Sequence, residues 1–165
     1  MSKVLVTGAA GFIGSNLVDG LLKNNFEVVG LDNLSTGSLD NLKDSIGQIE
    51  FHEGDIRNKT LCNELCKHVD FILHHAAYIS VPGSFENPIE TNDINVNGTL
   101  NLLQCAAQSN VKRFVHVSSA AVYGNQDFPS RVDCISPYAY TKHIGELYAK
   151  MFNDNYFVNS SLNIL

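Results

Sequence analysis

The sequence of 165 residues lacks any apolar run near the length of about 20 residues that a membrane-spanning helix requires. It also lacks a basic cluster, since Lys and Arg number 11 against 17 Asp and Glu and the net charge is −6. An acidic chain without a basic patch is not expected to bind nucleic acid. The first strand begins near Lys3, which leaves no room for a signal peptide. We therefore expect a cytoplasmic protein with neither a membrane nor a nucleic-acid partner.

Cysteine is scarce, and its spacing excludes the common metal and redox motifs. The four cysteines are Cys62, Cys66, Cys105 and Cys134. Cys62 and Cys66 stand one helical turn apart, which matches neither a CxxC redox pair nor a zinc knuckle. We expect reduced thiols packed in helices and no metal site.

Short, β-branched apolar runs alternate along the chain with segments of helical period. The runs that predict strands are 4–6, 28–31, 49–51, 71–73 and 114–117. The segments of helical period are about 12–24, 38–44, 59–68, 89–109 and 138–153. This alternation predicts one α/β domain over 1–165, a Rossmann-type doubly wound parallel sheet with helices on both faces. Residues 160–165 resemble the beginning of a sixth strand, so we expect a domain truncated at about that strand.

A glycine-rich turn follows the first strand and opens the first helix. Its glycines are Gly8, Gly11 and Gly14, with Phe12 and Ile13 between the last two. A turn in this position brings bare backbone N–H groups and a helix N-terminus against a pyrophosphate, as in dinucleotide-binding domains. Asp32 ends the next strand, where a carboxylate accepts hydrogen bonds from the adenosine ribose and repels a 2′-phosphate. The pattern predicts a dinucleotide site that prefers NAD to NADP.

A second constellation lies in the C-terminal third. Tyr138 and Lys142 stand four residues apart and share one helix face after Pro137, while Ser119 follows the fifth strand. A lysine ammonium favours the phenolate of a nearby tyrosine, which could then exchange a proton with an alcohol while Ser119 holds the same oxygen. Taken singly, a Tyr–Lys pair is usually a solvated helix face, and Ser118-Ser119 is usually a strand end that caps a turn. Their order behind a nucleotide loop favours the catalytic interpretation.

With these motifs, residues 3–151 resemble the extended short-chain dehydrogenase/reductase family, and specifically its nucleotide-sugar 4-epimerases. The further motifs behind the resemblance are 32–37 (DNLSTG), 54–57 (GDIR), 74–77 (HHAA), 95–99 (NVNGT) and 118–124 (SSAAVYG). The resemblance implies further NAD contacts from Asn33, Ser35, Thr36, Gly37, Asp55, Ile56, Ala76, Ala77, Asn95, Ser118, Tyr138 and Lys142. For Asp55 a turn residue, and for Asn95 a buried helix hydrogen-bonder, remain open alternatives. His74 and His75 are expected at a strand end near the cofactor.

The resemblance also implies a reaction. The related dehydratases carry an acidic residue after the catalytic serine or threonine, where this chain has Ala120-Ala121. We therefore expect C4 epimerisation of a UDP-sugar, UDP-N-acetylglucosamine or UDP-glucose, through a 4-keto intermediate with Tyr138 as acid and base. Ser80 and Ser84 are expected near the sugar, together with Ser119 and Tyr138. The alternatives are a truncated, non-catalytic NAD-binding remnant and a reductase of another alcohol or nucleotide sugar.

Two further expectations concern assembly. Family members are about twice as long, so we expect this chain to lack the C-terminal substrate domain that grips the UDP group. The helical segments 89–109 and 138–153 have apolar faces broader than one sheet contact needs. In relatives these helices pair as a four-helix bundle, so a homodimer is expected, although the faces could simply meet the sheet.

Overall fold

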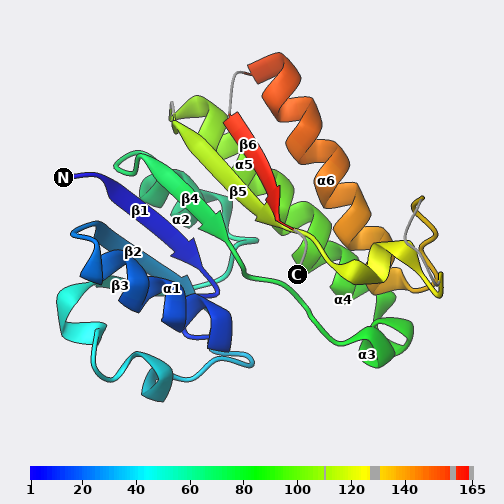
Figure 1. Ribbon diagram of the computed structural model, residues 1–165, viewed down its shortest axis with the longest axis horizontal. Coiled ribbons are helices and arrows are strands. Elements are labelled where there is room, and N and C mark those ends of the chain that lie inside the picture. The colour runs from blue at the N-terminus through cyan, green and yellow to red at the C-terminus, as the bar shows by residue number, and fades with distance from the viewer. Residues whose placement is uncertain (110, 127–130, 157–158, 164–165) are drawn as a thin grey trace.

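Six parallel strands form the centre of the computed structural model, which describes residues 1–109, 111–126, 131–156 and 159–163. The strands are β1 (Lys3–Thr7), β2 (Glu27–Asp32), β3 (Glu50–Glu53), β4 (Phe71–His74), β5 (Arg113–Val117) and β6 (Asn159–Asn163). Their spatial order is β3-β2-β1-β4-β5-β6, which reverses direction between β1 and β4 (Figure 1). This is the order of a Rossmann-type doubly wound sheet, so the predicted fold class is confirmed.

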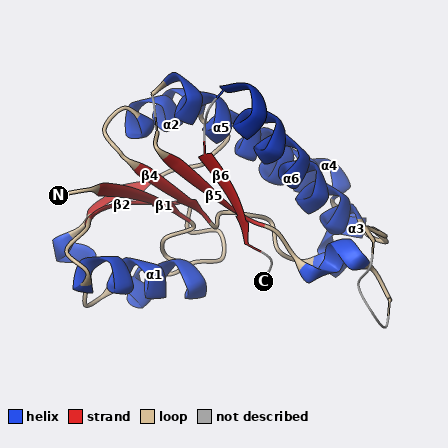
Figure 2. Ribbon diagram, turned by 45° about the horizontal axis from the view of Figure 1, so that its top comes forward, coloured by secondary structure: helices blue, strands red, loops and turns tan. Residues whose placement is uncertain are grey.

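Helices cover the two faces of the sheet. The helix α1 (Phe12–Lys23) lies on one face, and α2 (Lys59–Cys66), α5 (Thr99–Gln108) and α6 (Pro137–Tyr156) lie on the other (Figure 2). Successive residues of β1 point to opposite faces, so Val4 and Val6 pack with the α1 layer and Leu5 packs with the α2 and α5 layer. Two apolar clusters result, one on each side of the sheet.

Strand register places the functional motifs at one edge. Thr7 at the end of β1 pairs with Leu31 on one side and with His74 on the other. His74 in turn pairs with His116 near the end of β5. The carboxyl ends of four neighbouring strands therefore meet, which is where ligands bind in open α/β sheets.

The helices differ from the sequence prediction in three places. The segment 38–44 contains only the 3-10 turn η1 (Leu39–Leu42), followed by a second one, η2 (Ile46–Gln48). A short helix not foreseen, α3 (Val81–Glu86), begins where the Ser80 hydroxyl accepts the Gly83 amide at 3.0 Å. Short helices of this kind arise from local capping and carry too few turns to show a hydrophobic period.

The predicted helix over 89–109 is also interrupted. It consists of α4 (Pro88–Asn92), the π-helical turn η3 (Asp93–Gly98) and α5. A further 3-10 turn, η4 (Ala120–Tyr123), follows β5. π-helical turns of this kind often mark functional sites.

The remaining expectations concern the cysteines and the chain end. All four thiols are free, and Cys62, Cys66 and Cys105 are buried in α2 and α5, but Cys134 lies in the loop before α6 and not in a helix. The sixth strand covers 159–163, and residues 164–165 of the predicted strand lie outside the described part of the chain. Among the described helices, none combines the length and apolarity needed to cross a bilayer.

Candidate functional site

The glycine turn after β1 is compact and needs glycine at two positions. Gly8 has φ +70°, and a Cβ on it would lie 2.8 Å from the Ala76 nitrogen. A Cβ on Gly14 would lie 2.0 Å from the Gly8 carbonyl oxygen, because the first turn of α1 packs directly on the loop. Gly8 thus permits the tight turn, and Gly14 permits the close packing of α1 on the loop.

The N-terminus of α1 faces outward without a side-chain cap. Gly11 occupies the cap position, and the first turn contains no acidic residue. The first N–H groups of a helix have no partner within the helix and carry a partial positive charge. Phe12 and Ile13 are exposed beside them. This terminus fits an anionic group of the size of a diphosphate.

Asp32 is the last residue of β2 and is only 7% exposed. Its Oδ2 accepts the Ala10 amide at 2.9 Å, and its Oδ1 accepts the Leu34 amide at 2.8 Å. A carboxylate has about four acceptor positions, so these bonds hold the glycine turn and leave acceptor capacity toward a ligand.

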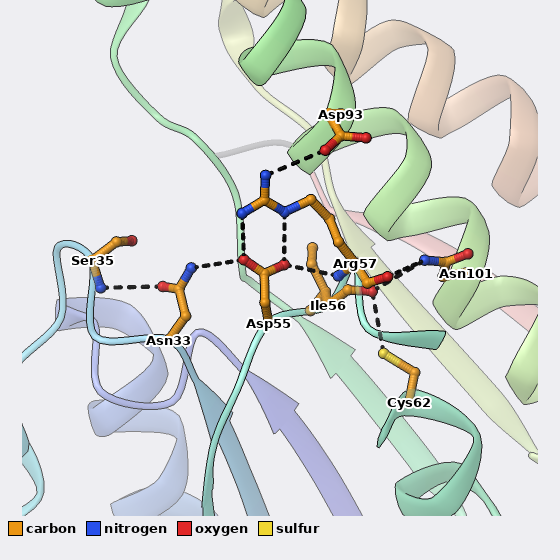
Figure 3. Close-up of polar contacts among 8 residues, drawn as sticks. All are labelled: Asn33, Ser35, Asp55, Ile56, Arg57, Cys62, Asp93 and Asn101. Atoms are coloured by element: carbon orange, nitrogen blue, oxygen red, sulfur yellow. Dashed lines mark hydrogen bonds and ion pairs between the residues drawn. The ribbon is translucent and has the colours of Figure 1, made fainter. Parts of the chain in front are cut away.

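Next to Asp32, the loop after β3 carries a polar network (Figure 3). The Arg57 guanidinium donates to both carboxylate oxygens of Asp55, at 3.0 and 2.7 Å, and to Asp93 of η3 at 3.2 Å. The hydrogen bonds from Arg57 lower the pKa of Asp55 to about 2. Asn33 donates to the same carboxylate at 3.2 Å and accepts the Ser35 amide at 3.1 Å. Asp55 is therefore ionised and held rigidly at this end of the site.

One cavity of about 510 Å³ joins these features to α6. Its volume lies within the usual range for small-molecule sites. It is lined by every predicted cofactor residue except Asn95, including Thr36, Gly37, Ile56 and Ala77. It is also lined by residues that sequence reasoning did not assign, among them Tyr78, Ile79 and Ile94.

The predicted Ser–Tyr–Lys group lies at the other end of this cavity. Ser119, Tyr138 and Lys142 all line it. The Ser119 hydroxyl oxygen accepts the Ala121 amide at 3.2 Å, which leaves its proton to be donated elsewhere. Burial lowers the pKa of Lys142 to about 8, and the charge of Glu146 opposes that change. Lys142 is thus a lysine whose charge depends on its neighbours.

Two predicted residues lie behind the cavity wall. Ser84 is fully buried on α3, where its hydroxyl donates to the Val81 carbonyl at 2.7 Å and accepts the Tyr138 amide at 3.1 Å. The expectation that Ser84 contacts a sugar does not fit this placement, because its hydroxyl anchors the start of α6. Ser80, which caps the same helix, does line the cavity.

Asn95 is the second such residue, and it acts through its neighbours. It is 3% exposed, and its amide bonds both the nitrogen and the carbonyl of Tyr78, at 2.7 and 3.0 Å. It also donates to the Thr141 hydroxyl of α6 at 3.0 Å. Asn95 does not line the cavity, so the NAD contact that the resemblance implies does not fit this placement. The alternative interpretation, a buried hydrogen-bonding residue of the helix, agrees with these bonds.

Two buried histidines underlie the site, and only one of them is hydrogen-bonded. The His74 ring bonds the hydroxyls of Thr7 at 2.7 Å and Thr99 at 2.9 Å. Because Thr99 donates its proton to the Asn95 carbonyl, the neutral His74 ring donates from Nε2 and accepts at Nδ1. Neither ring nitrogen of His116 has a partner among the described residues. Burial lowers the pKa of His116 to about 3. The charge of Lys142 lowers this pKa further, and the main chain of Lys142 raises it in part.

His75 is the histidine that reaches the cavity, as predicted for a strand end near the cofactor. Burial, assisted by the charge of Lys142, lowers its pKa to about 4. A neutral ring therefore faces the cavity at neutral pH. Among the described residues, no group of three or more His, Cys, Asp or Glu side chains is placed to hold a metal ion.

Comparison with known proteins agrees with this geometry. Residues 4–164 match the NAD dependent epimerase/dehydratase family. A putative UDP-glucose 4-epimerase from Methanocaldococcus jannaschii is 40% identical over 96% of the chain and 53% of its own length. The chain thus spans about half the length of the curated relatives it matches.

Solved structures show the same similarity. A dTDP-glucose 4,6-dehydratase from Streptomyces venezuelae, solved with NAD bound, superposes with a TM-score of 0.92 at 36% identity, over 98% of this chain and 55% of its own. A UDP-N-acetylglucosamine 4-epimerase from Methanobrevibacter ruminantium superposes with a TM-score of 0.91 at 34% identity, over 98% and 53%. The expectation of NAD as the cofactor agrees with the family description and with the NAD in the dehydratase. On its sequence and its fold, the chain belongs to the NAD dependent epimerase/dehydratase family.

Proposed function

We propose that this chain binds NAD and forms the cofactor-binding part of a UDP-sugar 4-epimerase. The observation that carries the proposal is that one cavity is lined by the glycine turn with Asp32 and by Ser119, Tyr138 and Lys142. A dinucleotide bound along the cavity would reach from the first group to the second. The two motifs are distant in sequence, and the sheet brings them together.

The cofactor fits the residues that are present. The N-terminus of α1 suits the diphosphate, and Asp32 suits the adenosine ribose hydroxyls. At Gly8 and Gly14 the neighbouring backbone lies so close that a side chain at either position would fill the turn. Asp55 and Ile56 would flank the adenine, and Ala76 and Ala77 would leave room for the cofactor at the end of β4. When bound, NAD supplies a site that accepts and returns a hydride.

Side chains of this chain would carry out the proton transfer. Tyr138 would take the proton from the C4 hydroxyl of the sugar and return it, while Ser119 donates a hydrogen bond to the same oxygen. Lys142, when charged, would stabilise the phenolate of Tyr138. Ser118 and Ser80 line the same cavity, and Ser80 would lie near the sugar.

UDP-N-acetylglucosamine and UDP-glucose are the two substrates we propose. The relatives include a putative UDP-glucose 4-epimerase and a UDP-N-acetylglucosamine 4-epimerase. The similarity to a dehydratase favours a second candidate, another nucleotide-sugar reaction of the same family. Ala120 and Ala121 supply no carboxylate at the place where dehydratases are expected to carry one, which supports epimerisation.

The assembly we propose is a homodimer through a four-helix bundle of α4–α5 and α6. These helices present exposed apolar side chains: Ile89 is 85% exposed, Tyr140 58% and Leu147 53%. Sedimentation tests this, because a dimer should dissociate when Leu147 is changed to Lys. The cytoplasmic location stays a prediction.

Titration with NAD and NADP tests the cofactor site. Asp32→Asn should weaken NAD binding at least tenfold while narrowing the preference for NAD over NADP, because the repulsion of a 2′-phosphate is removed. Gly11→Val should weaken the binding of both NAD and NADP, because even a Cβ on Gly11 would lie 3.2 Å from the Gly8 carbonyl oxygen. Asp40→Asn, on the exposed turn η1, is the matched control and should change neither. If NAD affinity survives both site changes, the site is misplaced.

Turnover of UDP-sugars is tested separately. Tyr138→Phe should lower turnover by roughly 10²- to 10⁴-fold while NAD affinity stays near that of the unchanged chain. Undiminished epimerisation in this variant would reject the proton-transfer role. Absence of turnover in the unchanged chain, with NAD binding intact, would favour the non-catalytic alternative.

A further inference from the structure

Glu146 lies on α6 one turn after Lys142, outside the lining of the cavity, and its side chain is only 15% exposed. Both carboxylate oxygens are engaged. Oε1 accepts the hydroxyl of Ser118, and Oε2 contacts Nδ1 of His143 at 3.1 Å. A nearly buried carboxylate with two dedicated partners has a fixed position.

The contact with Ser118 joins two walls of the site. Ser118 directly follows β5 and precedes Ser119, whereas Glu146 belongs to the helix that presents Tyr138 and Lys142. Ser118 and Glu146 are 28 residues apart in sequence. Their hydrogen bond therefore ties the end of the strand to the helix at the level of the cavity.

Glu146 also acts on the charge of Lys142, which stands one turn earlier on the same helix. The other ionisable groups that interact with Lys142 are His74 and His75 at the end of β4 and His116 on β5, and Tyr138 stands one turn before Lys142 on α6. Burial lowers the pKa of all three histidines, so they carry no charge at neutral pH. Within the described residues, the Glu146 carboxylate is the group that raises the pKa of Lys142 against burial.

We propose that Glu146 is a positioning residue, which keeps the Lys142 ammonium charged and clamps α6 to the end of β5 through Ser118. Its value to catalysis rests on the proposed function, because a charged Lys142 is what would support Tyr138. The clamp and the charge are properties of this chain alone, so both can be measured without turnover.

The charge is tested by NMR titration of Lys142 in the protein labelled with ¹³C at lysine Cε, its signal assigned with Lys142→Arg. Glu146→Gln keeps an acceptor for Ser118 but removes the negative charge. The titration midpoint of Lys142 should therefore fall by about one pH unit. Asp154→Asn is the matched control on the same helix. It lies about 18 Å further along the axis than Lys142, beyond the screening length, and should leave the midpoint unchanged.

The conservative variant Glu146→Asp keeps the carboxylate, so its midpoint should stay within about 0.3 pH unit of the unchanged chain. This arm shows whether a fall in Glu146→Gln comes from the lost charge, and Glu146→Ala replaces Glu146→Gln in the titration if the Gln variant fails to fold. An unchanged midpoint in the Gln variant, or a fall of a full unit in the Asp variant, would overturn the proposal.

The clamp is tested by a double-mutant cycle of Ser118→Ala and Glu146→Ala, which removes the acceptor of the hydrogen bond, in urea unfolding. The effects on the unfolding equilibrium constant should be non-additive by about threefold or more, and additive effects would refute the clamp. Where turnover is measurable, the alkaline limb of its pH profile should move to lower pH in Glu146→Gln and return in Glu146→Asp. Failure of the unchanged chain to bind NAD would refute the proposed function but leave the lysine titration as the test of Glu146.

Discussion

The burial of His116 predicts how the stability of the protein changes with acid. The imidazole is 1% exposed and has no hydrogen-bond partner among the described residues. The helix α6 lies directly on it, since a Cβ on Gly145 would come within 2.5 Å of its Nε2. We expect His116→Leu, an apolar side chain of similar volume, to remove the share of the protein's sensitivity to mild acid that His116 contributes beside His74 and His75.

The magnitude follows from the difference in proton uptake between the two states. In the unfolded chain a histidine has a pKa of about 6.5, whereas burial lowers the pKa of His116 to about 3 in the folded state. Between these values the unfolded chain binds a proton that the folded chain does not, so the stability is complete above about pH 6.5 and falls as the pH falls toward 3. Each such proton changes the free energy of unfolding by about 1.4 kcal/mol per pH unit, which gives about 2 kcal/mol between pH 7 and pH 5.

Urea denaturation at pH 7, 6 and 5 checks this prediction. The sequence has no tryptophan, so far-UV circular dichroism is the suitable signal. At pH 7 the free energy of unfolding of the variant should lie within about 1 kcal/mol of that of the unchanged chain, because the His116 ring nitrogens have no hydrogen bond to lose within the described residues. At pH 5 the unchanged chain should have lost about 2 kcal/mol more than the variant. Equal losses in both proteins would refute the reasoning and show that His116 gains its proton without unfolding.

Three further changes test the architecture of the site. Asn95→Ala breaks three hydrogen bonds of a buried side chain and should lower the free energy of unfolding by about 2–4 kcal/mol in urea denaturation, whereas Asn97→Ala, in an exposed position of the same turn, should cost much less. Gly14→Ala places a Cβ against the Gly8 carbonyl, so calorimetric titration should show a loss of NAD binding of at least tenfold, and retained affinity would mean that α1 does not close on the loop. Arg57→Ala removes the partner that lowers the pKa of Asp55 to about 2. The variant should be less stable than the unchanged chain above about pH 4, and this difference should shrink as the pH falls toward 2. Acid denaturation followed by circular dichroism measures both effects.

The parts of the site that the sequence predicted depend on local geometry. Gly8 and Gly14 are required by a turn that spans seven residues, and Asp32 ends a strand whose apolar pattern is plain. Tyr138 and Lys142 share a helix face at a fixed spacing. In each case the signal lies within one strand, turn or helix, so the residue types alone carry it.

The parts that it did not predict depend on contacts between distant segments. Ser84 meets the Tyr138 amide across 54 residues, so its burial behind the cavity could not be read from the motif around it. The pair of Ser118 and Glu146 is likewise formed by tertiary packing, and Glu146 belongs to no motif that the sequence analysis assigned. Segment 38–44 shows the opposite error, because a short helical period there is satisfied by a 3-10 turn.

The π-helical turn η3 gives this stretch of helix a surplus residue, and that surplus sets a limit on how the chain can vary. Deleting one residue within Asp93–Gly98 would remove the surplus and let α4 run into α5 as regular helix, with the faces of both helices kept. The wide turn that carries Ile94 and Asn95 would then be lost, although α4 and α5 themselves would be unchanged. For this stretch the length of the segment is thus as much a part of the ligand site as the identity of its side chains.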